Sequence, residues 1–260
     1  MTSTPLAVTF ADGADHPAVH ATLASLPKHY RHAGPGAGAV TAVTTLAALR
    51  TALDARPSGI LLTAATADSA GTVRELAERA HAAGIPVVVA GPWALDPAVT
   101  AVAGTLDVEG ASLIEVTATV PPGRTSADVL LDQLALLRTA IAPARAVEVT
   151  QADGHGHLAR AQVGDVPVHL SAAVSGLGTR RARLDVLGPA VQWRLTFADP
   201  ATAAPATVVR TDAEGEHLFP TVYESAYRAA WRHLHAAVTG GAVPPYSLHD
   251  LADDLALLAP

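Results

Sequence analysis

Residues 59–63 read Gly-Ile-Leu-Leu-Thr and residues 85–90 read Ile-Pro-Val-Val-Val-Ala, two apolar runs separated by a stretch with helical spacing. The helix between them is expected to begin at Asp68 or Ser69. It is expected to end at Gly84, because a glycine just past the last turn accepts a left-handed backbone. Continuous apolar strands joined by helices are typical of a parallel sheet covered on both faces. This stretch therefore predicts an α/β fold.

The same alternation extends toward the N-terminus and stops near residue 105. An apolar run at Leu6–Phe10 precedes a helical pattern at Pro17–Leu26. Beyond residue 105 we expect a strand at Ser112–Val120 and a helix that is capped by Ser126 and runs to about Ile141. Short extended segments joined by Gly, Asp and Pro turns then predict a largely antiparallel sheet. These segments are Ala146–Ala152, His157–Val163, Val166–Val174, Arg180–Leu187, Val191–Phe197 and Thr207–Thr211.

Two domains follow from this change of pattern. Residues 1–105 are expected to form an α/β domain with a parallel sheet. Residues 106–260 are expected to form an α+β domain with an open, largely antiparallel sheet. Its last two helices, Phe219–Thr239 and Leu248–Leu258, are expected to return to the first domain.

Composition excludes several classes of protein. Half of the 260 residues are hydrophobic, which excludes a disordered chain, and the formal net charge of −7 argues against a nucleic-acid partner. The most apolar stretch, Ile85–Gly104, is interrupted by prolines and Asp96, so we expect no membrane span. The segment MTSTPLAVTF lacks the pattern of a signal peptide. A cytoplasmic protein is expected.

Three stretches in this order resemble the glucose–fructose oxidoreductase / inositol dehydrogenase / MocA family (Gfo/Idh/MocA). The first runs from Ser58 to Ala94, and the second from Asp128 to Val149. The third, Tyr227–Leu258, contains the pairs Gly240-Gly241 and Pro244-Pro245. The resemblance implies a Rossmann-like nucleotide-binding domain, an open-sheet domain and NAD(P)-dependent oxidoreductase activity.

The positions that carry this activity in the family differ here. The turn at residues 11–16 keeps one glycine and contains Asp12 and Asp15, which would face an anionic ligand. The resemblance places the family's lysine at Gly91, its histidine at Asp132 and the following aspartate at Ala135. We therefore expect a degenerate Rossmann-like sheet that binds no cofactor, with NADP or NAD as the alternative.

The sequence then predicts a protein that binds a small organic molecule between its domains. It would catalyse a non-redox cyclisation, isomerisation or elimination, or assist a biosynthetic partner. The alternatives are an NAD(P)H-dependent oxidoreductase with atypical cofactor contacts and a non-catalytic pseudoenzyme subunit. Whether the chain is an enzyme is left open.

The candidate site residues follow from the resemblance and from local pattern. The catalytic candidates are Asp132, His16 and His155, since acid–base chemistry needs a titratable group. Asp132 stands first among them because the resemblance places it where the family's histidine lies. The substrate-binding candidates are Trp93, which follows an apolar strand, Asp128, and Arg180, which could bind a carboxylate together with Arg181 and Arg183. A solvated edge strand protected by charge explains the three arginines more simply, and Trp93 could equally fill the vacated cofactor site.

Histidine pairs and a glycine-rich segment allow other readings. His155 and His157 in Asp-Gly-His-Gly-His, or His16 and His20, could ligate a metal, but a hairpin turn and an exposed first helical turn explain them more simply. Residues 34–38, Gly-Pro-Gly-Ala-Gly, are interpreted as a loop. No metal is expected. The expected partners are a small ligand, a second copy of the chain joined through the open sheet, and an enzyme partner.

Overall fold

The computed structural model describes residues 4–11, 17–33, 39–64, 66–106, 108, 110–202 and 204–258. The chain separates into two units, residues 1–91 with 227–256 and residues 92–226 with 257–260. The boundary expected at residue 105 falls instead after Gly91. The reason is that α4 (Pro97–Val102) packs against α5 (Ser126–Ala140) of the second unit.

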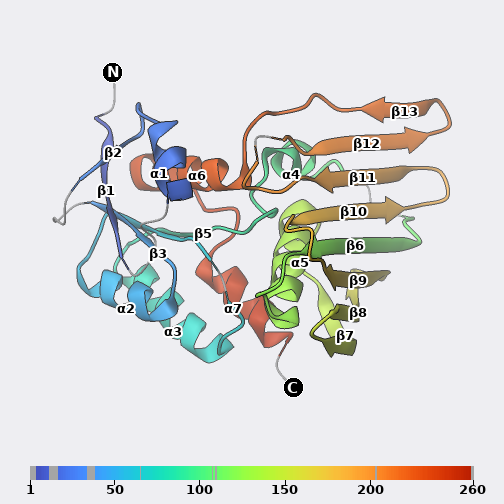
Figure 1. Cartoon of the computed structure of the whole chain (residues 1–260), viewed down its shortest axis with the longest axis horizontal. Helices are drawn as coiled ribbons and strands as arrows, with labels where there is room; N and C mark the ends of the chain where they lie inside the picture. The colour runs from blue at the N-terminus through green and yellow to red at the C-terminus, as the bar shows by residue number, and fades with distance from the viewer. Residues whose placement is uncertain are drawn as a thin grey trace. The chain divides into compact units, whose positions relative to one another are not determined.

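The first unit contains a five-stranded parallel sheet in the order β2-β1-β3-β4-β5 (Figure 1). Its strands are β1 (Leu6–Phe10), β2 (Tyr30–His32), β3 (Val40–Val43), β4 (Gly59–Leu62) and β5 (Val87–Val89). Its helices are α1 (Pro17–Ala24), α2 (Leu46–Asp54), α3 (Ala70–Ala82), α6 (Ala226–Gly240) and α7 (Leu248–Ala256). The predicted Rossmann-like sheet is confirmed, with β2 shortened to three residues at one edge.

Local interactions explain why these segments fold as predicted. Ser69 accepts a hydrogen bond from the backbone N–H of Thr72 and begins α3, and Gly84 adopts a φ of 65° just after that helix. The hydroxyl of Tyr30 donates to the carbonyl oxygen of Trp231 at 2.6 Å, which joins the edge strand to α6.

The second unit contains an eight-stranded sheet in the order β13-β12-β11-β10-β6-β9-β8-β7. Its strands are β6 (Leu113–Val120), β7 (Arg145–Asp153), β8 (Gly156–Val163), β9 (Val166–Val174), β10 (Arg181–Leu187), β11 (Gln192–Phe197), β12 (Thr207–Asp212) and β13 (Gly215–Leu218). Among the described strand pairs of this second sheet, only β6–β9 is parallel. The predicted open, largely antiparallel sheet is confirmed.

One face of this sheet packs on α5 (Figure 1). Alternate residues of β6, including Ile114 and Val116, are buried together with Leu134 and Leu137 of the helix. The expected start of this helix requires a correction. Thr125 caps it in a reciprocal capping box with Asp128, and Ser126 is the first helical residue.

The other face of the sheet is charged. Asp185, whose side chain is 3% exposed, contacts Arg183 at 2.6 Å and Arg194 at 2.9 Å, and Glu115 is its neighbour on β6. Dimerisation through this face stays a prediction. No helix in the described part of the chain has both the length and the apolar character that a membrane crossing needs.

Candidate active site

Four strands of the second sheet bring their ends to one edge. Arg181 of β10 pairs with Thr119 of β6, and Val174 of β9 pairs with Val120. Gly156, at the start of β8, pairs with Ala173. The segments next to these ends therefore lie at the same edge, and they carry four of the expected site residues: Asp128, Asp132, His155 and Arg180.

Hydrogen bonds fix the start of α5 at this edge. The hydroxyl of Ser126 donates to the carbonyl oxygens of Asp153 and Gly156, at 3.0 and 3.1 Å, and ties the helix to the β7–β8 turn. The carboxylate of Asp128 accepts from the backbone N–H of Thr125 at 3.2 Å. Asp128 is buried and caps the helix, so its geometry does not support the expected contact with substrate.

Asp132 lies one turn further along α5 and is 6% exposed. Arg124 donates to its Oδ2 atom at 2.8 Å from the turn between β6 and α5. Burial raises the pKa of Asp132 most strongly, the charges of Arg124 and Arg180 oppose this shift, and the nearby Asp128 adds a smaller upward contribution, so that the pKa is about 7. Asp132 can therefore both give and accept a proton near neutral pH.

Arg180 is a half-buried cation at the same edge. Its backbone N–H donates to Asp199 at 2.9 Å. Its guanidinium forms no hydrogen bond or ion pair with any residue that the structure describes. Its charge nevertheless reaches Asp132 and lowers the pKa of that carboxyl group. The guanidinium is therefore available to bind an anion.

The two histidines of the β7–β8 turn have separate environments. His155 is exposed, and its backbone N–H donates to Asp153 at 2.8 Å. His157 is buried, with Nε2 at 2.8 Å from the Gln133 Oε1 atom, while the Gln133 amide donates to Val116 and Ser171. Because one ring is exposed and the other lies in the core, this pair does not form a metal site.

The buried His157 should make the stability of the fold depend on pH. Burial lowers the pKa of His157 to about 4 from 6.5. Between these pH values the unfolded chain binds the additional proton, so the free energy of unfolding falls as the pH falls through this window. In urea unfolding at pH 7 and pH 5, we expect His157→Gln to remove about 2 kcal/mol of this loss. The exposed control, His155→Gln, should keep the full loss of unfolding free energy between pH 7 and pH 5. An equal loss in both variants would contradict the conclusion that His157 causes it.

Two other expected site residues are not placed in the site. Trp93 is fully buried in the hydrophobic core of the second unit, and this burial does not support the expected contact with substrate. Its position after a strand predicted a pocket, but the ring packs in the core instead. His16, together with Asp12 and Asp15, lies outside the described residues, as do residues 34–38.

The structure also shows a cluster of possible metal ligands that the sequence pattern did not indicate. Asp212, Glu214 and His217 lie on the β12–β13 hairpin, with their ligand atoms within 4.8 Å of one another. Arg210 contacts Asp212 and competes for its carboxylate. Glu214 and His217 are exposed, while Asp212 is partly buried.

The carboxyl ends of β1 and β2 form a second region of interest, in the first unit. β1 lies between β2 and β3, and such a point of reversed strand order is where open α/β sheets bind dinucleotides. Phe10 ends β1 and stacks on His32, which ends β2, at 5.6 Å between ring centroids. Arg31 beside it is exposed, and no acidic residue occurs between Leu26 and Thr45. These basic side chains fit a phosphate-bearing dinucleotide.

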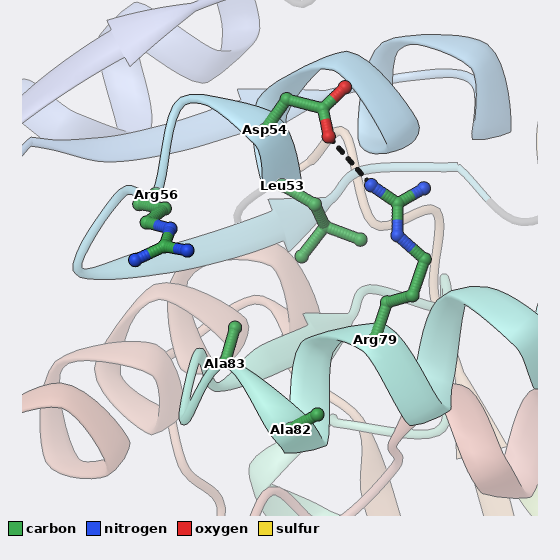
Figure 2. A pocket seen from close by; sticks show the side chains of 6 residues that line it. All are labelled: Leu53, Asp54, Arg56, Arg79, Ala82 and Ala83. Atoms are coloured by element: carbon green, nitrogen blue, oxygen red, sulfur yellow. Dashed lines mark hydrogen bonds and ion pairs between the residues drawn. The ribbon is translucent and has the colours of Figure 1, made fainter.

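A cavity of about 390 Å³ lies elsewhere in the first unit (Figure 2). Figure 2 shows Arg79 directed at Asp54, to which it donates at 2.7 Å, with Arg56 set apart from them. The cavity is lined by the C-terminal ends of α2 and α3, the helices that precede β4 and β5. It is therefore at the amino-terminal edge of the sheet, and ligands of such sheets bind at the carboxyl edge.

A Rossmann-like unit followed by an open sheet with one covering helix is the two-domain fold of the Gfo/Idh/MocA proteins. Among solved structures, the chain is similar to KijD10, a 3-ketoreductase from Actinomadura kijaniata, with a TM-score of 0.70 and 15% identity over 98% of this chain and 96% of that one. It is similar to GenD2 from gentamicin A biosynthesis, with a TM-score of 0.71 and 15% identity over 99% and 93%.

The UDP-N-acetylglucosamine 3-dehydrogenase GnnA from Acidithiobacillus ferrooxidans has a TM-score of 0.69 and 12% identity over 98% of this chain and 95% of its own. By sequence, the chain matches no protein-family model and no curated protein. The resemblance drawn from the sequence is thus confirmed for the fold.

These structures require one correction. The expectation that no cofactor binds is contradicted, because KijD10 is solved with NADP and GenD2 with NAD. That expectation rested on the absence of the family's motif residues from this sequence. The fold, however, is shared with KijD10 and GenD2 at only 15% sequence identity. A nicotinamide cofactor was the alternative drawn from the sequence.

Proposed function

We propose that the chain is an NADP(H)-dependent oxidoreductase that interconverts a hydroxyl and a carbonyl group on a small sugar-like substrate. The observation that carries this proposal is Asp132, a buried carboxyl group with a pKa of about 7 held by Arg124. Support for the substrate class comes from the shared fold with a 3-ketoreductase and a UDP-N-acetylglucosamine 3-dehydrogenase.

Asp132 supplies the proton chemistry of this reaction. A bound nicotinamide would supply or accept the hydride. In the direction of reduction, protonated Asp132 gives its proton to the carbonyl oxygen of the substrate. Arg124 holds the carboxyl group in place and stabilises the carboxylate that forms, because its charged hydrogen bond strengthens as Asp132 loses the proton. In the direction of oxidation, the carboxylate of Asp132 takes the hydroxyl proton.

The changed family positions are compatible with this role. The resemblance places a glycine, Gly91, at the family's lysine and Asp132 at its histidine. General acid–base catalysis needs a positioned group whose pKa lies near the working pH, and burial gives Asp132 that property. The carboxyl group can therefore take over proton transfer without a lysine or a histidine.

The residues at the end of β2 favour NADP over NAD. NAD-binding sheets carry an acidic residue near this point to bind the ribose hydroxyls, whereas an arginine accommodates the additional 2′-phosphate. Arg31 is exposed here, and no acidic residue lies nearby in the sequence. A charge-assisted bond from Arg31 to the phosphate would strengthen NADPH binding and leave NADH binding unaffected.

Fluorescence titration of the purified chain with NADPH and NADH tests the cofactor. We expect tighter binding of NADPH, and Arg31→Ala should weaken it about tenfold or more while NADH affinity stays the same. Arg50→Ala, which removes an exposed arginine paired with Glu75 on α3, serves as the matched control and should change neither affinity. Failure of both cofactors to bind the folded protein at millimolar concentration would overturn the proposed function.

A further inference from the structure

We propose that Arg180 binds a carboxylate group of the substrate, so that the chain acts on sugar acids or hydroxy acids whose acid group lies within a few bonds of the reacting carbon. This inference rests on the proposed function and names the substrate class of the same site.

The position of Arg180 supports this role. It directly precedes β10, and Arg181 pairs with Thr119 near the end of β6. β6 leads through Arg124 into α5, so the two arginines reach the edge that carries Asp132 from neighbouring strands. A group bound between them would lie against the carboxyl group of Asp132.

The guanidinium of Arg180 forms no ion pair with the described charged groups at this edge, although its charge acts on Asp132. Asp132 is bonded to Arg124, and Asp128 accepts from the cap of α5. Asp199 accepts from the backbone N–H groups of Arg180 and Ala201, at 2.9 Å each. The guanidinium of Arg180 has no ion-pair partner in the part of the chain that the structure describes.

A carboxylate fits this guanidinium better than other anions do at this place. The planar fork of arginine matches the two oxygens of a carboxylate. Arg180 directly precedes β10 beside the end of β6, so an acid group bound to it would lie at the edge that carries Asp132, on which the charge of Arg180 also acts. The diphosphate of a nucleotide sugar is instead attached at a distance from most reacting carbons of the sugar.

A carboxylate at Arg180 would also prepare the catalyst. A negative charge beside Asp132 raises the pKa of that carboxyl group and keeps it protonated. Asp132 would therefore be protonated when an acidic substrate binds, and neutral sugars would not have this effect. The carboxylate of the substrate thus serves both to bind Arg180 and to keep Asp132 protonated.

Calorimetry on the NADP⁺-bound protein tests the inference with D-glucuronate, D-galacturonate and 3-hydroxybutyrate as probes and D-glucose as the neutral analogue. We expect at least one acid to bind more tightly than D-glucose. Its affinity should fall about tenfold or more in Arg180→Ala and less in Arg180→Lys. Arg181→Ala, which removes the exposed neighbouring arginine, should leave the affinity unchanged.

Three results would overturn the inference: no acid binds better than D-glucose, the preferred acid binds Arg180→Ala as tightly as the unchanged protein, or UDP-glucose binding depends on Arg180 while acid binding does not. NADPH titration of the same variants separates the two proposals. If NADPH binds normally but acids do not, only the carboxylate inference fails. If NADPH does not bind at all, the proposed function fails as well.

Discussion

Asp132→Asn is expected to lower turnover by about 100- to 10,000-fold, which is the usual range for the loss of a general acid. Asparagine keeps the shape of the side chain and an oxygen that can accept from Arg124, but it carries no transferable proton. NADPH affinity should stay the same. The measurement is the rate of NADPH oxidation with the best substrate of a panel of keto sugars and keto acids.

The pH profile of the unchanged protein provides a second readout of the same group. Reduction needs the protonated acid, so the rate should fall as the pH rises through the pKa of Asp132, about 7. This dependence should disappear in the residual activity of Asp132→Asn. Asp165→Asn, at the exposed β8–β9 turn, is the control and should keep both the rate and the profile. A rate for Asp132→Asn above one tenth of that of the unchanged protein would exclude Asp132 as the acid.

Gly156→Ala is expected to produce the largest loss of stability. A Cβ atom at this position would lie 1.9 Å from the Ala172 carbonyl oxygen, and the φ of 146° is one that residues with a side chain rarely adopt. Steric overlap and backbone strain each cost about 1–3 kcal/mol. We therefore expect a loss of about 3–5 kcal/mol, which corresponds to a decrease in Tm of roughly 10 °C.

The same turn provides a matched control for this substitution. A Cβ atom on Gly154 would meet no atom within 4 Å, so Gly154→Ala should change the Tm by only a few degrees. Thermal unfolding followed by circular dichroism compares the two variants. Equal Tm values would show that the pairing of β8 with β9 at Gly156 is not as close as the structure has it.

The sequence predicted the elements that depend on burial and on local capping. β4, α3 and β5 were predicted because wholly apolar runs and a Ser69 cap leave few alternatives. β13 was missed, since Gly-Glu-His-Leu at residues 215–218 is short and exposed and shows no alternation. β13 forms because it pairs with β12, and its own sequence carries no strand pattern.

The sequence predicted individual residues of the candidate site but not that they lie together. Asp132 was a candidate because of the family resemblance and Arg180 because of the local basic pattern, but the edge that they share depends on pairing between strands far apart in the sequence. Arg124 was missed because a single arginine in a turn has no periodic pattern. The only sign was that it is the one basic residue in Pro-Pro-Gly-Arg-Thr, directly before the helix.

The pairing of β6 with β9 has a consequence for the order in which the second unit assembles. Hairpins such as β8–β9 and β10–β11 close short loops, so they can form early at a small entropic cost. Placing Ile114 beside Val168 instead requires the chain to enclose α5 and two further strands. Long-range parallel contacts of this kind slow folding and leave unpaired strand edges exposed during it. We therefore expect a newly made chain to complete last the centre of the sheet, next to the helix that carries the proposed proton donor.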